Sequence, residues 1–293
     1  MTTPATEPNR ISKVLDYIDA HLDQNLSVEE LSAVGAYSVF HFHRQFSAQV
    51  GLSCFTYVQL CRMKSAAAQL AFRRDKSVID IALNHGYDEP ESFSRAFKKH
   101  TGQAPSEFRK SPLWEPWYSR LNALTQLRKT QMPQQFRPEQ VDVINFNVTP
   151  VAIYAHHGNP ALLPQTIRNF IQWRKEHKLT PTRYATFNLL YEQHDEVAPE
   201  DFRFDLATQI EPGFTSTHDN IVCTEIPAGS CARLRLLGSD DGLERAIRFL
   251  YAEWLPQSGK SVRDFPLFLQ RLNFFPDVPE NELITDIYLP LDL

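Results

Sequence analysis

The pattern of apolar and polar positions between Ser27 and Gly51 is repeated between Ser77 and Gly102. In each copy a serine precedes a short segment with apolar residues three apart, and a second segment with phenylalanines four apart follows a turn. This spacing predicts a helix, a tight turn and a second helix in each copy. Equivalent residues are 50 apart before the turn and 51 apart after it, so one residue is inserted where the second copy's second helix begins.

The second helix of each copy is expected to have a buried side and an exposed side. Phe42 and Phe46, like Phe93 and Phe97, are four residues apart and therefore share the side that faces the core. Ser27 followed by Glu30 predicts a capping box at the start of the first helix. The side chains left exposed on the second helices are Phe40, His43, Arg44 and Ser47 in the first copy, and Glu91, Ser92, Ser94 and Arg95 in the second.

The exposed side of the first copy's second helix suits the major groove of DNA. An arginine can bond guanine O6 and N7 together, and an apolar ring can contact a thymine methyl group. The equivalent side in the second copy is less basic, so we expect it to read fewer bases and to contact phosphates through Lys98 and Lys99. An alanine-rich helical segment over 53–72 would hold the two recognition helices about 34 Å apart, in successive major grooves. Whether Arg62 contacts phosphate or solvent stays open.

Residues 9–110 resemble the DNA-binding region of the AraC/XylS family of transcription regulators. The resemblance is carried by the two copies, by Arg62 between them, and by residues 102–109, which are similar to the family's terminal Gly-x-x-Pro-x-x-aromatic-Arg signature. It implies an all-α domain of two helix-turn-helix units joined by a linker helix, with double-stranded promoter DNA and RNA polymerase as partners. The base-reading positions that it implies are Val39, Phe40, His43 and Arg44 in the first unit, and Glu91, Ser92 and Arg95 in the second.

The remainder of the chain predicts a connector and a second domain. Residues 111–137 contain three prolines around a short helical segment that extends to Lys129. From residue 138 onward, alternating apolar and polar positions recur with a period near 80. Each copy predicts a strand, a helix and two strands, giving an α+β domain over 138–293 with one antiparallel sheet and its helices on one side. Equivalent residues are Gly158 and Gly238, Trp173 and Trp254, and Asp205 and Asp286.

This second domain resembles the GyrI-like effector-binding domain, through His157-Gly158, Trp173, Trp254-Leu255-Pro256 and the closing segment 285–290. The order of the two regions resembles the Rob-like architecture of multidomain AraC/XylS regulators. The resemblance implies a site for hydrophobic ligands, with a glutamate on a late strand that meets cationic ones. Leu269 occupies the position of that glutamate.

The leucine changes the expected ligand chemistry, because it cannot compensate the desolvation of a bound cation. We therefore expect a small hydrophobic effector that is neutral or anionic. Arg271 is either its counter-charge or a solvent-facing residue of a site that has lost its ligand. The candidate ligand-binding residues are Tyr154, Phe187, Tyr191, Trp254, Leu269 and Arg271.

The charge distribution fits a protein of which only one part meets phosphates. The net charge is −5, but residues 1–130 hold 16 Lys and Arg against 13 Asp and Glu, whereas the remainder holds 14 against 22. A net +3 on the first part and −8 on the second is the asymmetry expected when one domain binds nucleic acid. With no apolar run long enough for a membrane span and a polar N-terminus, we expect a cytoplasmic protein.

No catalytic, metal or cofactor site is expected. The chain has neither a nucleophile elbow nor a phosphate loop, and His156-His157 lacks the spacing of a zinc site. Its four cysteines have no CxxC spacing, which predicts free buried thiols. Two alternatives for the second domain remain: a hydrolase of the kind found among GyrI-like relatives, and a protein-interaction module without a small ligand.

Overall fold

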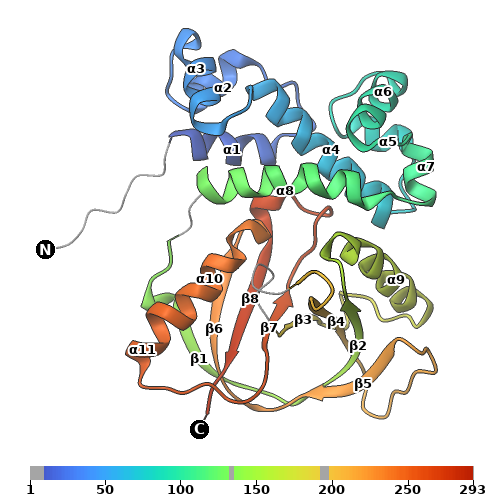
Figure 1. Cartoon of the computed structure of the whole chain (residues 1–293), viewed down its shortest axis with the longest axis vertical. Helices are drawn as coiled ribbons and strands as arrows, with labels where there is room; N and C mark the ends of the chain where they lie inside the picture. The colour runs from blue at the N-terminus through green and yellow to red at the C-terminus, as the bar shows by residue number, and fades with distance from the viewer. Residues whose placement is uncertain (1–9, 132–134, 192–197, 293) are drawn as a thin grey trace, which may run out of the picture. The chain divides into compact units, whose positions relative to one another are not determined.

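The computed structural model describes residues 10–131, 135–191 and 198–292. These residues form two compact units (Figure 1). The first holds residues 10–131 together with Phe275–Asn281, and the second holds the other described residues. The expected start of the DNA-binding region at Asn9 lies outside the described residues. No helix among those described is both long and apolar enough to cross a bilayer.

The first unit is all-α, as predicted. Two helix-turn-helix units, α2 with α3 and α5 with α6, are joined by the linker helix α4. The helices are α1 (Arg10–Ala20), α2 (Val28–Val34), α3 (Val39–Val50), α4 (Cys54–Phe72), α5 (Val78–Leu83), α6 (Pro90–Thr101), α7 (Pro105–Lys110) and α8 (Trp114–Gln131).

The helix boundaries follow local signals in the sequence. The amide of Asp80 donates to Ser77 Oγ at 3.0 Å and the Ser77 amide donates to Asp80 Oδ2 at 3.3 Å, which completes a capping box on α5. The box predicted on α2 is only half formed. The Glu30 amide donates to Ser27 Oγ at 3.1 Å, but the Glu30 carboxylate accepts from the Tyr17 hydroxyl instead. Sequence spacing therefore predicted both helix starts, but it did not predict that the Tyr17 hydroxyl would bond the Glu30 carboxylate.

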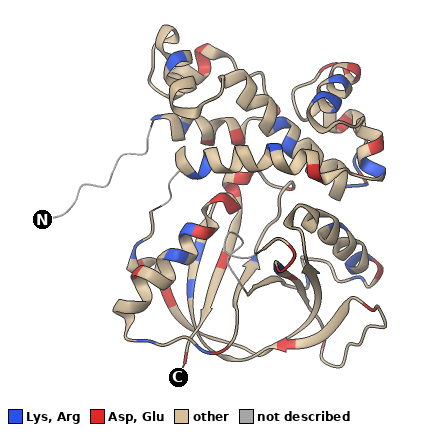
Figure 2. Ribbon diagram, in the orientation of Figure 1, with Lys and Arg blue, Asp and Glu red and all other residues tan. Residues whose placement is uncertain are grey.

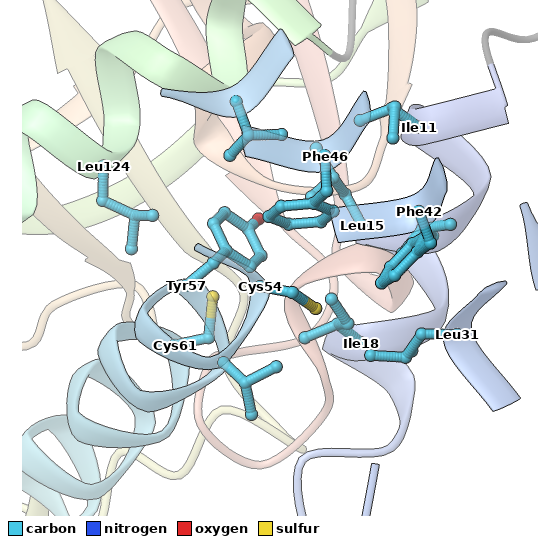
Figure 3. Packing of buried hydrophobic residues seen from close by; sticks show 13 residues of the cluster. Ile11, Leu15, Ile18, Leu31, Phe42, Phe46, Cys54, Tyr57, Cys61 and Leu124 are labelled. Carbon is cyan, nitrogen blue, oxygen red and sulfur yellow. The ribbon is translucent and has the colours of Figure 1, made fainter. Parts of the chain in front are cut away.

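Each helix-turn-helix unit has its own core. Phe42 and Phe46 are fully buried against α1 and α4 in the first core, as Figure 3 shows. Phe93 and Phe97 are fully buried in the second core, together with alanines of α4. The prediction that these phenylalanine pairs face inward is confirmed. Since both recognition helices are fixed by the same two positions, their opposite sides are presented outward in the same way.

The second unit is built on one antiparallel sheet of eight strands in the order β1-β6-β8-β7-β3-β4-β2-β5 (Figure 1). The two predicted copies are β2-α9-β3-β4 and β6-α10-β7-β8, and they meet where β3 pairs with β7. The strands are β1 (Val141–Phe146), β2 (Thr149–His157), β3 (Thr186–Leu190), β4 (Arg203–Gln209), β5 (Ile221–Ile226), β6 (Gly229–Leu237), β7 (Leu267–Arg271) and β8 (Ile284–Pro290). The helices are α9 (Leu163–Glu176), α10 (Leu243–Phe249), a π-helical turn η4 (Leu250–Trp254) and α11 (Leu255–Ser258).

The two edge strands exchange partners between the copies. Strand β1 precedes the first copy but pairs with β6 of the second, and β5 precedes the second copy but pairs with β2 of the first. The sequence pattern did not predict this exchange. It links the two copies at both edges of the sheet as well as at the β3–β7 seam.

Helices α9 and α10 cover the same face of the sheet, as predicted. Leu206, Asn188 and Leu269 are successive cross-strand partners, so their side chains share one face. Leu206 packs in a cluster with Trp173 of α9, and Leu269 packs in a cluster with Leu250 that follows α10. The opposite face holds a separate aromatic cluster whose members include Phe187, Phe268 and Tyr288.

Candidate nucleic-acid interface and effector domain

Helix α3 presents an exposed face of mixed chemistry. Phe40 is 90% exposed and Val39 is 39% exposed, although both are large apolar residues. His43, Arg44 and Ser47 are exposed as well. Within the described part of the chain, Arg44 makes no hydrogen bond or ion pair. Among the described residues, nothing bonds the Arg44 guanidinium and little covers the Phe40 ring, so both groups are open to solvent.

Helix α6 presents a different face. The Arg95 guanidinium donates to Ser92 Oγ at 3.0 Å, and the Ser92 hydroxyl in turn donates to Glu89 Oε2 at 3.3 Å. Glu91 and Arg95 are exposed, whereas Ser92 is half-buried. This chain of bonds satisfies part of the hydrogen-bonding capacity of the face internally. Lys98 and Lys99, also exposed, lie in the last turn of the helix.

Basic and acidic residues are both distributed over residues 10–131 (Figure 2). The net +3 of residues 1–130 is therefore the small difference between two mixed sets of charges, and any basic character of a DNA-facing side depends on a few particular side chains. The basic candidates on the two recognition helices are Arg44 on α3 and Arg95, Lys98 and Lys99 on α6.

Arg62 of α4 has a structural position. Its Nε donates to the Leu22 carbonyl at 2.9 Å and its terminal nitrogen donates to the Gln24 carbonyl at 2.6 Å. A Cβ atom on Gly86 would lie 2.6 Å from the same guanidinium, and the φ of +70° at Gly86 also favours glycine. Arg62 thus joins the segment after α1 to the turn of the second helix-turn-helix unit. The sequence left open whether Arg62 contacts phosphate or solvent. In the structure its guanidinium instead bonds backbone carbonyls within the protein.

The ligand-binding candidates of the second unit do not form one cluster. Tyr154 packs with α9, whereas Trp254 and Leu269 pack together in the core beneath α10. Phe187 lies on the opposite face of the sheet. Leu269 is fully buried, and it faces Asn188, its equivalent in the first copy, across the β3–β7 seam. The seam position that the resemblance associates with a carboxylate is therefore apolar on one strand and an amide on the other.

Arg271 is engaged within the protein. Its Nε donates to Asn188 Oδ1 at 2.9 Å, and a terminal nitrogen donates to Thr285 Oγ1 at 3.2 Å. The same nitrogen forms an ion pair with Asp240. Its side chain is 15% exposed, so the alternative of a solvent-facing arginine does not describe it. A carboxylate already balances its charge.

Tyr191 belongs to a separate polar group. Its hydroxyl donates to Asp205 Oδ2 at 2.8 Å, and its ring lies under the Arg203 guanidinium at 3.8 Å. Partial burial and the hydrogen bond to Asp205 raise the pKa of Tyr191 to about 12. Asp205 itself is fully buried and ion-paired with Arg203. The tyrosine is neutral at physiological pH and is already engaged.

The cysteines are free, and three of them are buried as predicted. Cys223 on the edge strand β5 is exposed, which corrects the expectation for that residue. Burial raises the pKa of Cys54 and Cys61 to about 12, so both remain thiols. Among the described residues, no group of three or more His, Cys, Asp or Glu side chains could hold a metal ion.

Comparison with known proteins identifies both regions. Residues 139–292, more than half of the chain, match the GyrI-like small molecule binding domain, and the chain belongs to this family. Residues 31–111 match a helix-turn-helix domain. The predicted combination of an AraC-type head with a GyrI-like domain is thereby confirmed.

Several relatives are described as regulators. The probable transcriptional regulator YgiV of Escherichia coli strain K12 is 32% identical over 152 residues, which cover 52% of this chain and 95% of that protein. The transcriptional regulator Rob of Salmonella typhimurium is 34% identical over 104 residues, or 36% of each chain. The uncharacterized HTH-type transcriptional regulator YbfP of Bacillus subtilis strain 168 is 38% identical over 99 residues, covering 34% of this chain and 33% of that one. The chain spans about a third of the length of the last two.

Proposed function

We propose that this protein is a sequence-specific DNA-binding transcription regulator that inserts α3 and α6 into successive major grooves of promoter DNA. The observation that carries the proposal is the outward face of α3, where Phe40, His43 and Arg44 are exposed and Arg44 has no partner among the described residues. Such a face can combine bidentate guanine recognition with an apolar contact to thymine. The helix-turn-helix match and the regulator relatives support the same conclusion.

Within this proposal α3 and α6 make different kinds of contact with DNA. Val39, Phe40, His43, Arg44 and Ser47 of α3 contact bases. On α6, Glu91, Ser92 and Arg95 make the fewer base contacts, while Lys98 and Lys99 contact phosphates. The proposed extents are 9–110 for the DNA-binding domain, 111–137 for the connector, whose helix α8 packs on the DNA-binding unit, and 138–293 for the effector domain.

The test is competition between specific and random DNA. Sites bound by the full chain are selected from genomic DNA of its source, and the affinity of one such duplex is compared with that of a random duplex at one salt concentration. A regulator of this class should prefer its site by about 10³-fold or more. Equal affinities for the two duplexes would contradict the proposal.

For the effector domain we propose a small hydrophobic molecule without net charge. Leu269 offers no carboxylate to a cation, and Arg271 already forms an ion pair with Asp240. A bound anion would have to displace that carboxylate, which makes the anionic alternative less favourable than it was from sequence alone. An uncharged apolar molecule can be buried without a carboxylate partner and without displacing Asp240 from Arg271.

Thermal melting of the full chain tests this proposal with neutral, cationic and anionic amphiphiles of one chain length. The expected result is a melting temperature raised by the neutral compound above the other two. The matched variant Leu269→Glu should gain a response to the cation, because it restores a carboxylate at the seam. A cation-selective response of the unmodified protein would contradict the proposal, and no response to any compound would favour a protein-interaction module instead.

We further propose RNA polymerase as the macromolecular partner and the cytoplasm as the location. We assign no catalytic residue, because the polar groups of the effector domain described above, Arg271 with Asp240 and Tyr191 with Asp205, already bond to each other. Turnover of model esters by the full chain would contradict the assignment and favour the hydrolase alternative.

A further inference from the structure

Helix α8 packs into the cores of both helix-turn-helix units. Trp114 and Trp117 near its start are buried in the second core with Phe97 and Phe108. Leu124, about two turns beyond Trp117, is buried in the first core, where Figure 3 shows it near Tyr57. The region expected to be a connector therefore contains an 18-residue helix that belongs to the DNA-binding unit.

The same helix bonds the C-terminal ends of both recognition helices. Arg120 donates to the carbonyls of Lys99 and His100, at 3.0 and 2.7 Å, in the last turn of α6. Gln131 Nε2 donates to the Gln49 carbonyl, at 2.6 Å, in the last turn of α3. The last four carbonyls of a helix have no partner within the helix, so an external donor both satisfies them and fixes the direction of the helix end. A cation there is also favoured by the helix dipole.

The two donors are spaced to act together. Arg120 and Gln131 are eleven residues apart, which on an α-helix is about three turns and about 16 Å, so they project from nearly the same side of α8. Between them, Arg128 forms a bidentate ion pair with Asp19 of α1, at 2.9 and 2.6 Å, and donates to the Tyr57 hydroxyl of α4 at 3.0 Å. Arg128 and Asp19 are both buried. This buried pair fixes α8 along its axis relative to the first unit.

Helix α8 complements α4 as a connection between the units. Helix α4 begins in the first core, with Tyr57 and Cys61, and ends in the second, with Leu70. Helix α8 runs in the opposite sense, from the second core to the first. One helix fixes a separation but allows rotation about its ends, whereas two helices bonded to different parts of the same units restrict rotation as well.

We propose that α8 sets the separation and relative orientation of α3 and α6, and thereby the spacing of DNA half-sites that the protein accepts. Arg120 and Gln131 are its positioning residues. The inference rests on the proposed function, since it assumes that α3 and α6 enter successive grooves. One base pair inserted between half-sites moves one of them by about 3.4 Å along the duplex and by about 34° around it. A rigidly held pair of helices cannot follow this change, and a loosened pair can.

The experiment measures the affinity of the full chain for a selected operator and for versions with one base pair removed or added between the half-sites. The unmodified protein should lose about tenfold or more in affinity at either altered spacing. The double variant Arg120→Ala/Gln131→Ala should lose only about twofold, so its spacing profile is flatter. The affinity of the double variant for the operator with the selected spacing should change less than its ratio of affinities between the selected and the altered spacings.

Matched variants separate positioning from general damage to the fold. Asn122→Ala, at an exposed position of α8, should leave the profile unchanged. Gln131→Glu keeps the shape of the side chain but removes its donor, so it should flatten the profile as Gln131→Ala does. Arg120→Lys keeps a cationic donor and should restore most of the discrimination. Melting temperatures of all variants are recorded in parallel.

The outcomes distinguish this inference from the proposed function. A protein that prefers no operator over random DNA contradicts the proposed function. A protein that prefers its operator but tolerates both altered spacings equally contradicts the positioning role of α8. The same conclusion follows if the double variant and Gln131→Glu keep the unmodified profile.

Discussion

The two recognition helices share a buried side and differ on the exposed one. On both, phenylalanines four residues apart are fully buried. On α3 the exposed face has a 90% exposed phenyl ring and an arginine that bonds to no described residue, whereas on α6 the arginine is bonded to Ser92 within its own helix. The duplicated fold keeps what packing requires and leaves the recognition chemistry free to diverge. We interpret α3 as the main base-reading helix and α6 as the weaker reader with phosphate contacts.

The two helix-turn-helix units also differ in their buried polar groups. The first contains the ion pair of Asp19 with Arg128, and the second contains His85, which is 1% exposed with Nδ1 2.6 Å from the Ile81 carbonyl. Burial opposes the charge on Arg128, but the Asp19 carboxylate keeps its pKa well above the ordinary value. Burial lowers the pKa of His85 to about 4. The stability of the first core thus depends on Arg128 being charged, and that of the second depends on His85 being neutral.

The largest expected effect is that of Arg128→Ala. The variant leaves the Asp19 carboxylate buried without its partner, which typically costs about 3–5 kcal/mol of unfolding free energy. Urea unfolding of the full chain measures it. Replacing both partners together, by Asp19→Leu with Arg128→Met, should recover most of the loss. A loss below about 1 kcal/mol for Arg128→Ala, the size typical of surface ion pairs, would show that the pair is not effectively buried.

The next effect is a pH dependence that belongs to the second unit. Well above pH 6.5 His85 is neutral in both the folded and unfolded states and contributes no pH dependence. Between pH 6.5 and about 4 the unfolded chain binds a proton that the folded chain does not, so stability falls as the pH falls, by about 3 kcal/mol in total.

Unfolding free energies of the unmodified protein and of His85→Gln across this range provide the test. The variant cannot titrate at this position, so the difference between the two curves should grow as the pH falls below 6.5. Carboxylates titrate in both proteins and cancel in the difference. Two parallel curves would rule out a buried neutral histidine as the cause.

Arg44→Ala compared with Arg95→Ala tests the inequality of the two faces. Loss of a bidentate base contact at Arg44 should cost about 1–3 kcal/mol on the selected operator and little on random DNA, and it should relax base choice at one position. Arg95→Ala should cost less, because part of its hydrogen bonding is directed to Ser92. Affinities on both duplexes are measured by fluorescence anisotropy. Equal losses on operator and random DNA would reassign Arg44 to phosphate contact.

The smallest effect is expected for Lys98→Ala. If Lys98 contacts a phosphate, the variant should weaken binding by a similar factor on every sequence. The slope of log affinity against log salt should become shallower by about 0.9 per lost contact. Ser47→Ala, at an exposed position on α3, provides the uncharged comparison and should keep the salt slope. Sequence-dependent weakening by Lys98→Ala would instead indicate that α6 reads bases at this position.

Local features of the fold were predictable from the sequence, and pairings between distant residues were not. Short-range spacing predicts the helix starts at Ser27 and Ser77 and the inward-facing phenylalanines, because these features depend on residues that are close in the sequence. No short-range pattern predicts the exchange of β1 and β5 between the copies, because the exchange depends on which distant strand has an unpaired edge. For residues 111–137 the sequence predicted a connector with a short helical segment up to Lys129, and the structure has α8 there, with a buried side. The sequence did not indicate that this side spans two cores.

The candidate sites show the same limit. Exposure of the α3 residues could be inferred, because it is the complement of a buried pattern. The partners of charged residues could not, since Arg62 bonds carbonyls of residues 22 and 24 and Arg271 pairs with Asp240. A long cationic side chain reaches many acceptors, and sequence spacing does not select among them. The free Arg44 and the bonded Arg95 are distinguishable only in the folded structure.

The most direct test of the unequal reading helices is selection of bound sites by the full chain from duplexes with a randomised region that spans both half-sites. We expect one half-site with strong base preference and a second with weak preference, separated by about one helical turn. Repeating the selection with Arg44→Ala should abolish preference at a position in the strong half only. Equally strong preference in both halves, or an effect of Arg44→Ala confined to the weak half, would show that α3 is not the main base-reading helix.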